Sequence, residues 1–227
     1  MRYGPKTYWY LGEAGLNFGD ALNPILFQRL AGVTLRWEPS SSADLFAIGS
    51  NLHLVPTSFR GTIFGAGTPG PTERYNLSKA KVLALRGWMS AERCRVRPRL
   101  LADPGLLATD LLEKRPVVDL EHGIIRHFSD GRKFKGYDID VLGGVDFVIR
   151  EAARCERISS SSLHGLILAD ALGIPNRWIP LRTSAHKFYD YASAFGERIK
   201  PMTWRLADQM QVADKQEALR KAFMSCL

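Results

Sequence analysis

A serine-rich turn holds the residues of this chain that are best suited to chemistry. The turn runs from Ser159 to Ser162, and His164 follows at the start of an apolar segment that stops at Gly173. This pattern predicts a helix that begins near Ser162. The first backbone N–H groups of a helix have no intrahelical acceptor, so with the serine hydroxyls and the imidazole they could bind phosphate or carboxylate without a metal. The alternative is that the serines only cap the helix and that His164 is a structural histidine.

Two other polar and glycine-containing segments follow predicted strands, where α/β proteins place ligand-binding groups. Asn17 and Gly19 are positioned to bring the backbone close to a ligand, whereas Asp20 is interpreted first as the N-cap of the next helix. Gly65 and Gly67 form a similar pair. Their spacing does not complete the dinucleotide fingerprint, and no acidic residue follows at the expected distance, so we reject a nicotinamide cofactor.

Basic residues lie beside several predicted strand ends. Arg86 and Arg126 occupy such positions, and His127 follows directly. Arginine binds phosphate and carboxylate groups bidentately, so these residues are candidates for holding an anion. The arginines within residues 93–99 are instead expected to form an exposed basic face. Asp103 begins an Asp-Pro-Gly segment, which indicates a turn first and a ligand site second.

Several reaction classes lack the residue patterns that they need. The sequence contains no P-loop, no paired-carboxylate glycosidase pattern, no nucleophile elbow and no metal-binding histidine pair. Cys94, Cys155 and Cys226 are widely spaced and have no histidine at metal-ligand spacing, so we expect free thiols rather than disulfides or a zinc site. The chemistry is therefore expected to use histidine, arginine and helix dipoles, with no metal.

The composition is that of an ordinary globular protein, with 45% hydrophobic and 24% charged residues among 227. No run approaches about 18 apolar residues, and the N-terminus lacks the residue order of a signal peptide, so we expect the protein to stay inside the cell. The formal net charge of +8 favours acidic partners: nucleic acid, an anionic lipid surface, or small phosphorylated and carboxylated substrates. Nucleic acid is disfavoured because the basic cluster lacks interleaved aromatic residues.

Short β-rich runs alternate with turns and helices, which is typical of parallel sheets in α/β proteins. The first predicted strands are 7–11, 44–48, 62–64 and 82–85, with a helix over about 20–31. After a charged break at 110–116, the second set comprises strands at 123–128, 139–142, 157–160 and 177–181 and helices at 145–155, 184–195 and 204–224. We therefore predict two small α/β units, residues 1–115 and 116–227, with a closing helix at the end.

Six segments, taken in order, resemble the polysaccharide pyruvyl transferase family. They are Asn17-Phe18-Gly19-Asp20, Phe64-Gly65-Ala66-Gly67, Arg86-Gly87, Asp103-Pro104-Gly105, Gly123-Ile124-Ile125-Arg126-His127 and Ser160 to Gly165. The resemblance implies two Rossmann-like units that face each other across a cleft, as in GT-B glycosyltransferases, with a C-terminal helix crossing back. It also implies transfer of pyruvate from phosphoenolpyruvate to a hydroxyl pair of a sugar, in a polysaccharide or its precursor, giving a ketal and phosphate without a cofactor.

With this resemblance as the premise, we hypothesise a role for each candidate residue. His164 would be the general acid or base that protonates the methylene carbon of the donor. Because a helix N-terminus disfavours the imidazolium form, a bound donor anion would be needed to restore that proton. Donor contacts are expected from the C-terminal unit and from one arginine before it: Arg126, Arg86, His127, Ser160, Ser161, Ser162, Leu163 and Gly165. Acceptor contacts are expected from Asn17, Gly19, Asp20, Gly65 and Gly67.

One position departs from the family pattern. Many members carry an arginine two residues before the motif histidine, and this chain has Ser162 there. Either another cation, such as Arg126, Arg86 or Arg182, neutralises the donor, or the donor site has changed. The chain is also short for the family, so we expect the acceptor-binding parts to be trimmed.

The expected partners are phosphoenolpyruvate and a glycan or lipid-linked oligosaccharide in the cytoplasm, and peripheral contact with the inner membrane face stays open. Two other functions also stay open at this point. One is a glycosyltransferase of the same architecture that uses a nucleotide sugar. The other is a non-catalytic module that binds glycans or polyanions.

Overall fold

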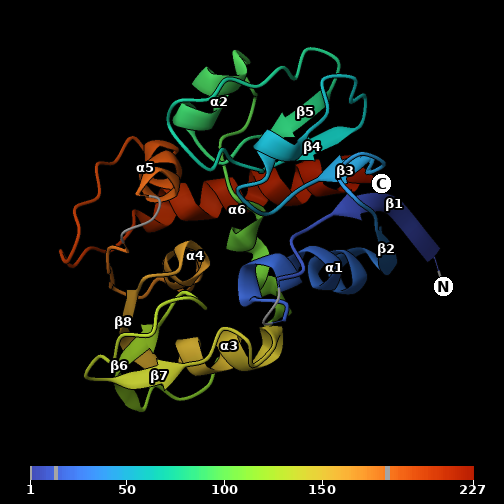
Figure 1. Ribbon diagram of the computed structural model, residues 1–227. Coiled ribbons are helices and arrows are strands. Elements are labelled where there is room, and N and C mark those ends of the chain that lie inside the picture. Colours follow the sequence, from blue (N-terminus) through green and yellow to red (C-terminus); the bar gives the residue numbers. More distant parts are fainter. Residues whose placement is uncertain (1, 13–14, 182–184) are drawn as a thin grey trace.

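Two parallel β-sheets with helices packed around them form the molecule, as the computed structural model shows for residues 2–12, 15–181 and 185–227 (Figure 1). The first sheet has the strand order β2-β1-β3-β4-β5 and the second has the order β7-β6-β8-β9. Every strand pair in both sheets is parallel. The predicted α/β class is therefore confirmed, and the arrangement is Rossmann-like.

The elements follow the chain in the order that the alternating pattern predicts. The first sheet contains β1 (Arg2–Tyr8), β2 (Val33–Trp37), β3 (Leu45–Phe46), β4 (Thr62–Phe64) and β5 (Lys81–Ala84). The second contains β6 (Leu120–Ile125), β7 (Tyr137–Ile139), β8 (Cys155–Ser160) and β9 (Asn176–Trp178). The α-helices are α1 (Phe18–Ala31), α2 (Trp88–Cys94), α3 (Val145–Ala153), α4 (Leu163–Leu172), α5 (His186–Ser193) and α6 (Gln209–Phe223), and the 3-10 segments are η1 (Leu52–Leu54), η2 (Pro104–Leu111) and η3 (Met224–Cys226). None of the helices in the described ranges combines the length and apolar character needed to cross a bilayer.

Local sequence signals missed one strand and one α-helix, and they misplaced the starts of α1 and of α6, which was predicted to begin at residue 204 and begins at Gln209. The sequence predicted neither β2 nor α2, since the first is a five-residue edge strand and the second is a seven-residue helix too short to show a period. The interpretation of Asp20 as the N-cap of α1 is wrong. Asn17 is the N-cap, because its side-chain oxygen accepts hydrogen bonds from the backbone N–H groups of Gly19 and Asp20. Residue 184, the first of a predicted helix, lies outside the described residues.

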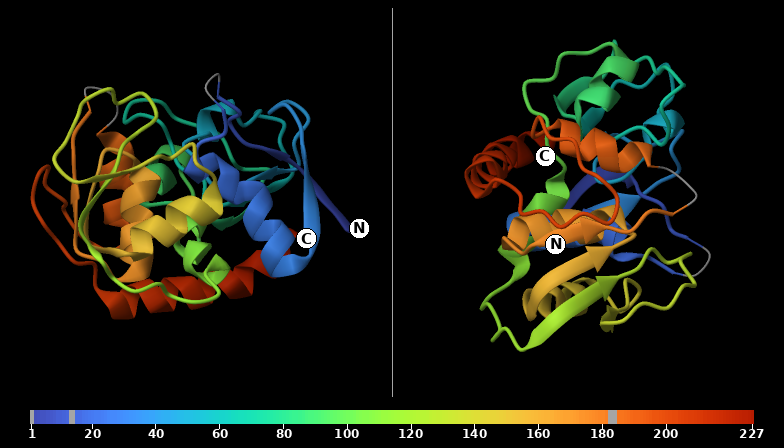
Figure 2. Two further views of the ribbon diagram at one scale, coloured as in Figure 1. Left: turned by 90° about the horizontal axis from the view of Figure 1, so that it is seen from below. Right: turned by 90° about the vertical axis from the view of Figure 1, so that its left-hand side faces the viewer.

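The last helix, α6, extends from the side of the second sheet to the side of the first (Figure 2). Near its end, the ring of Phe223 lies 4.4 Å from that of Phe27 in α1 and 5.9 Å from that of Phe64 in β4, centroid to centroid. The Lys215 Nζ donates a hydrogen bond to the carbonyl of Leu101 at 2.8 Å. The C-terminal helix therefore completes the apolar packing of the first unit.

One continuous apolar cluster joins the two sheets. It includes Leu22 of α1, Phe64 of β4, Ile125 of β6 and Leu166 of α4, all at most 2% exposed. A smaller cluster lies under α2 on the first sheet. Because close-packed side chains resist displacement, the shared core holds the two sheets in a defined relation. The boundary between residues 115 and 116 stays a prediction.

A buried ion pair also links the two halves of the chain. The Arg86 Nε donates to the Asp190 Oδ2 at 2.8 Å, and neither side chain has exposed surface. The other guanidinium nitrogens donate to the Ser50 hydroxyl at 2.6 Å and to the Thr68 carbonyl at 2.8 Å. Asp190 also accepts hydrogen bonds from the backbone N–H and the hydroxyl of Ser90. The buried guanidinium and carboxylate groups are therefore both hydrogen-bonded, which offsets the cost of burying their charges.

Removing one partner of this pair should be strongly destabilising. Asp190→Ala leaves Arg86 buried and uncompensated, so we expect the free energy of unfolding to fall by about 3–5 kcal/mol. The matched control is Asp146→Ala, which breaks the exposed 2.6 Å pair between Arg29 and Asp146 and should cost less than about 1 kcal/mol. Urea unfolding followed by circular dichroism measures both. Equal losses in the two variants would contradict the assignment.

Candidate functional site

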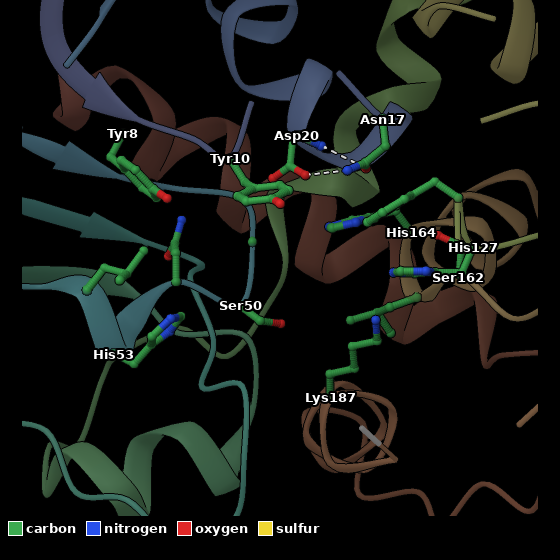
Figure 3. A pocket seen from close by; sticks show the side chains of 15 residues that line it. Tyr8, Tyr10, Asn17, Asp20, Ser50, His53, His127, Ser162, His164 and Lys187 are labelled. Atoms are coloured by element: carbon green, nitrogen blue, oxygen red, sulfur yellow. Dashed lines mark hydrogen bonds between the residues drawn. The ribbon is translucent and has the colours of Figure 1, made fainter. Parts of the chain in front are cut away.

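A cavity of about 480 Å³ lies where strand ends from both sheets meet (Figure 3). Open α/β sheets bind ligands at the carboxyl ends of their strands, and pockets for small molecules usually measure roughly 300–1,000 Å³. The lining side chains come from both halves of the chain: Tyr8, Tyr10, Asn17, Asp20, Gly49, Ser50, Asn51, His53, Leu54, His127, Phe128, Ser162, Leu163, His164 and Lys187. The position and size of the cavity therefore suit a small substrate held between the two sheets.

His164 lies in the first turn of α4 and is held by backbone on two sides. A Cβ atom at Gly19, in the first turn of α1, would overlap the imidazole ring, and one at Gly105 would lie 3.5 Å from it. The side chain is 14% exposed, and its Nε2 faces the buried Asp103 Oδ2 at 3.8 Å. A residue larger than glycine at position 19 would thus displace the ring. This close approach fixes the imidazole at the wall of the cavity.

Asp103 and His164 face each other with one unsatisfied atom each. The Asp103 Oδ1 accepts a hydrogen bond from the backbone N–H of Gly105 at 2.8 Å, which makes Asp103 the N-cap of η2. Among the described residues, neither the Oδ2 nor the His164 Nε2 has a hydrogen-bond partner, although both atoms are buried. Such orphaned groups are costly unless a small movement or a proton joins them. The turn predicted from the sequence is present, and it also provides the acid behind the histidine.

The protonation of this pair follows from burial and from nearby cations. Burial raises the pKa of Asp103 to about 6. Burial first, and then the charges of Arg86 and Lys187, lower the pKa of His164 to about 3. The imidazole is therefore neutral at pH 7, as the sequence predicted, but burial and neighbouring cations are the causes. Between pH 3 and 6 the pair holds one proton, which rests on the carboxyl group.

Other titratable groups on the cavity wall are also shifted toward their neutral forms. Burial, with the charge of Arg86, lowers the pKa of Lys187 to about 8, although Asp20 opposes this shift. Burial and the charge of Lys187 lower the pKa of His127 to about 4. Burial raises the pKa of Asp20 to about 6 despite its hydrogen bond from Asn17. The cavity thus disfavours both isolated cations and isolated anions in the absence of a ligand.

The structure brings together part of the predicted site. The predicted residues that line the cavity are Asn17, Asp20, His127, Ser162, Leu163 and His164. Ser160 and Ser161 have no exposed surface. The Ser160 hydroxyl donates to the carbonyl of Ile125, and the Ser161 hydroxyl donates to Asp130, both at 2.7 Å. These two hydroxyls therefore hold the turn in place, and Ser162 is the member of the serine run that faces the cavity.

Neither Arg126 nor Arg86 lines the cavity. The Arg126 Nε and Nη2 bind both oxygens of Asp138 at 2.8 and 2.5 Å. Arg86 is fully buried behind Ser50, whose hydroxyl accepts one of its hydrogen bonds. Ser50 does line the cavity, and no described residue accepts a hydrogen bond from its hydroxyl, so this hydrogen can be donated to a ligand. Arg86 therefore reaches the cavity through one hydroxyl and through its electric field, and Arg182 lies outside the described residues.

Three predicted glycines pack against elements behind the cavity. A Cβ atom at Gly67 would overlap the guanidinium of Arg86. A Cβ at Gly165 would overlap the Ser160 hydroxyl, where α4 approaches the strand ends. Gly65 has a φ of 83° and faces Pro104. These glycines permit close approach of the elements that carry His164 and Asp103.

Several lining residues were not predicted. Tyr8 and Tyr10 alternate at the end of the first predicted strand, and Ser50 follows the third strand, so their position after strands was a usable signal. Lys187 lies in the first turn of α5 without any turn or glycine motif of its own. Nothing local in the sequence distinguishes it from a surface lysine.

Comparison with known proteins identifies two relatives. The chain is 36% identical over 115 residues to an uncharacterized protein of Acanthamoeba polyphaga mimivirus, covering 42% of the chain and 40% of that protein. It is 27% identical over 220 residues to the succinoglycan biosynthesis protein ExoV of Rhizobium meliloti, covering 86% of the chain and 66% of that protein. The chain thus spans less than two thirds of the length of either relative. No family model matches the chain, and no solved structure is significantly similar. The chain is a distant homologue of a succinoglycan biosynthesis protein.

The low pKa of His164 should appear in the pH dependence of stability. Between pH 6.5 and 3 the unfolded chain protonates this imidazole and the folded chain does not, so acidification favours unfolding. His164→Asn removes this contribution. We expect the variant to lose less stability than the parent between about pH 6.5 and 4, by up to about 1.4 kcal/mol per pH unit. Urea unfolding at several pH values measures both slopes, and identical slopes would show that His164 titrates normally.

Proposed function

We propose that the chain is a pyruvyl transferase that moves pyruvate from phosphoenolpyruvate to a hydroxyl pair of a sugar, in a polysaccharide or its precursor. The observation that carries this proposal is the neutral His164 at the start of α4, in a cavity between two sheets, with Asp103 behind it, whose pKa of about 6 leaves a minor protonated fraction at pH 7. The distant similarity to a succinoglycan biosynthesis protein supports a polysaccharide substrate. The proposal includes a GT-B-like relation of the two units and a cytoplasmic location.

In this proposal, the donor anion binds at the N-terminus of α4, where backbone N–H groups and the helix dipole favour negative charge. The negative charge raises the proton affinity of His164. Because Nε2 faces Asp103, the other ring nitrogen, Nδ1, is the atom that delivers the proton to the methylene carbon. As the Nδ1–H bond breaks, the proton of Asp103 passes to Nε2, so the ring does not become an anion. Asp103 thus supplies the proton and His164 transfers it.

Protonation of the methylene carbon makes the central carbon of the donor electrophilic. A sugar hydroxyl then attacks that carbon, and Asp20, which is ionised at pH 7, accepts the hydroxyl proton. Cleavage of the C–O bond releases phosphate, and the second sugar hydroxyl closes the ketal. The second hydroxyl proton leaves on the released phosphate. The first, released from Asp20 to solvent, is matched by a proton that Asp103 takes up from solvent in place of the one given to the new methyl group, so the protons balance.

The first-sheet side of the cavity is suited to the acceptor. The rings of Tyr8 and Tyr10 lie on this wall and offer apolar faces of the kind on which sugars stack. The Asn17 side-chain amide donates a hydrogen bond to the Asp20 Oδ2 at 2.5 Å, which fixes the orientation of the carboxyl group. The acceptor therefore contacts Asp20 and the two tyrosines in this proposal.

Turnover measurements test the assignment of His164 and Asp103. Purified protein is incubated with phosphoenolpyruvate and candidate glycans, and phosphate release and product mass are followed. Loss of the general acid in His164→Gln should lower kcat roughly 100- to 10,000-fold. Asp103→Asn keeps the shape of the side chain but removes the titrating proton, so kcat should fall. Its pH–rate profile should also lose the decline with rising pH that the deprotonation of Asp103, with a pKa of about 6, causes in the parent.

Three outcomes would argue against pyruvyl transfer. Full activity of His164→Gln would remove the proposed acid. Stabilisation by nucleoside diphosphates but not by phosphoenolpyruvate would favour a glycosyltransferase. Glycan binding that persists in His164→Gln, with no turnover by the parent protein, would indicate a binding module.

A further inference from the structure

The proposed donor carries a phosphate and a carboxylate, yet the two arginines that were named as its partners and that lie within the described residues are committed elsewhere. Arg126 is held by Asp138, and Arg86 is buried against Asp190. Position 162, at the N-cap of α4, is a serine whose side chain makes no capping hydrogen bond. A multiply charged anion in a partly closed cavity needs a fixed cation beside it. Within the described residues, the cation must therefore come from another element.

We propose that Lys187 on α5, together with the N-terminus of α4, forms the phosphate subsite of this cavity. The inference rests on the proposed function only for the identity of the donor, since the subsite would bind any phosphate group of suitable size. Figure 3 shows the side chain of Lys187 on the same side of the cavity as Ser162, His127 and His164. Lysine and the start of α4 thus converge on one region although they lie on different elements.

None of the described residues forms an ion pair with Lys187. In the parts of the chain that the structure describes, its Nζ has no hydrogen bond and no carboxylate within ion-pair distance. Its one described contact is with the ring of Phe188, 5.6 Å from the centroid. A partly buried ammonium without an acceptor is unfavourable, and a bound anion would relieve that cost. The site is therefore organised to receive negative charge.

The groups that face Lys187 agree with this inference. The charge of Arg86 opposes its protonation and the carboxyl group of Asp20 favours it. Lys187 in turn lowers the pKa of His127 and of His164. The negative charge of a phosphate between these groups would favour their protonated forms and so raise the pKa values of Lys187, His127 and His164. Binding of the donor would then prepare His164 for its role as an acid.

The difference between an ammonium and a guanidinium group indicates which end of the donor Lys187 holds. An ammonium group is a compact charge with three donors, which suits the several oxygens of a tetrahedral phosphate, whereas planar carboxylate is matched by the fork of arginine. Helix N-termini are also frequent phosphate sites. Lys187 therefore holds the phosphate, and it would also hold the phosphate that leaves after the C–O bond breaks.

Calorimetric titrations with inorganic phosphate, phosphoenolpyruvate and pyruvate test the subsite without turnover. Lys187→Met should weaken phosphate and phosphoenolpyruvate binding roughly 10- to 100-fold and should change pyruvate binding less than about 3-fold. Lys187→Arg, which keeps the charge, should retain most of the affinity. The matched control is Lys215→Met, since Lys215 is also a partly buried helix lysine near an aromatic ring, 4.9 Å from the Phe195 centroid, but lies away from the cavity. Its phosphate affinity should equal that of the parent.

The outcomes separate this inference from the proposed function. Unchanged phosphate affinity in Lys187→Met, an equal loss of pyruvate binding, or no phosphate binding by the parent protein would overturn the subsite. A Lys187-dependent phosphate site in a protein that pyruvylates no glycan would support the subsite and overturn pyruvyl transfer. Continued pyruvylation by Lys187→Met with an unchanged KM for phosphoenolpyruvate would support pyruvyl transfer and overturn the subsite.

Discussion

Positive charge buried between the two sheets is the constraint on which the rest of the site depends. Arg86 has no exposed surface, and one carboxylate, Asp190, neutralises it. Its field reaches His164 and Lys187 and disfavours a second positive charge on either. The imidazole consequently stays neutral while the cavity contains only protein. A bound anion changes this balance more than any single hydrogen bond would, so ligand binding and proton affinity are coupled by electrostatics.

The fold fixes the position of the His164 ring, on which that coupling depends. Gly19 in α1 and Gly105 at the start of η2 allow two backbone segments to enclose the ring of His164. The continuous apolar core and the contacts of α6 hold the two sheets in one relation, so the ring cannot move far from either wall. Catalytic groups need such support, because small displacements of a proton donor weaken transfer strongly.

Local chemistry was predictable from the sequence, and long-range pairing was not. The serine turn, α4 and the strand-end segments have signatures within a few residues, so the position of His164 followed from the pattern. The partners of Arg86 and Arg126 are Asp190 and Asp138, which no local pattern connects to them. Both arginines look available in the sequence and are already paired in the fold. Lys187 presents the opposite case, since its isolation appears only when α5 packs beside α4.

The placement of Phe223 between α1 and β4 has a consequence for the birth of the molecule on the ribosome. The first sheet is synthesised early, but the contacts of Phe223 with Phe27 and Phe64 can form only after residue 223 has emerged from the exit tunnel. During most of translation, the first half of the chain therefore lacks part of its final apolar packing. Nascent-chain chaperones would find their exposed apolar target in that interval.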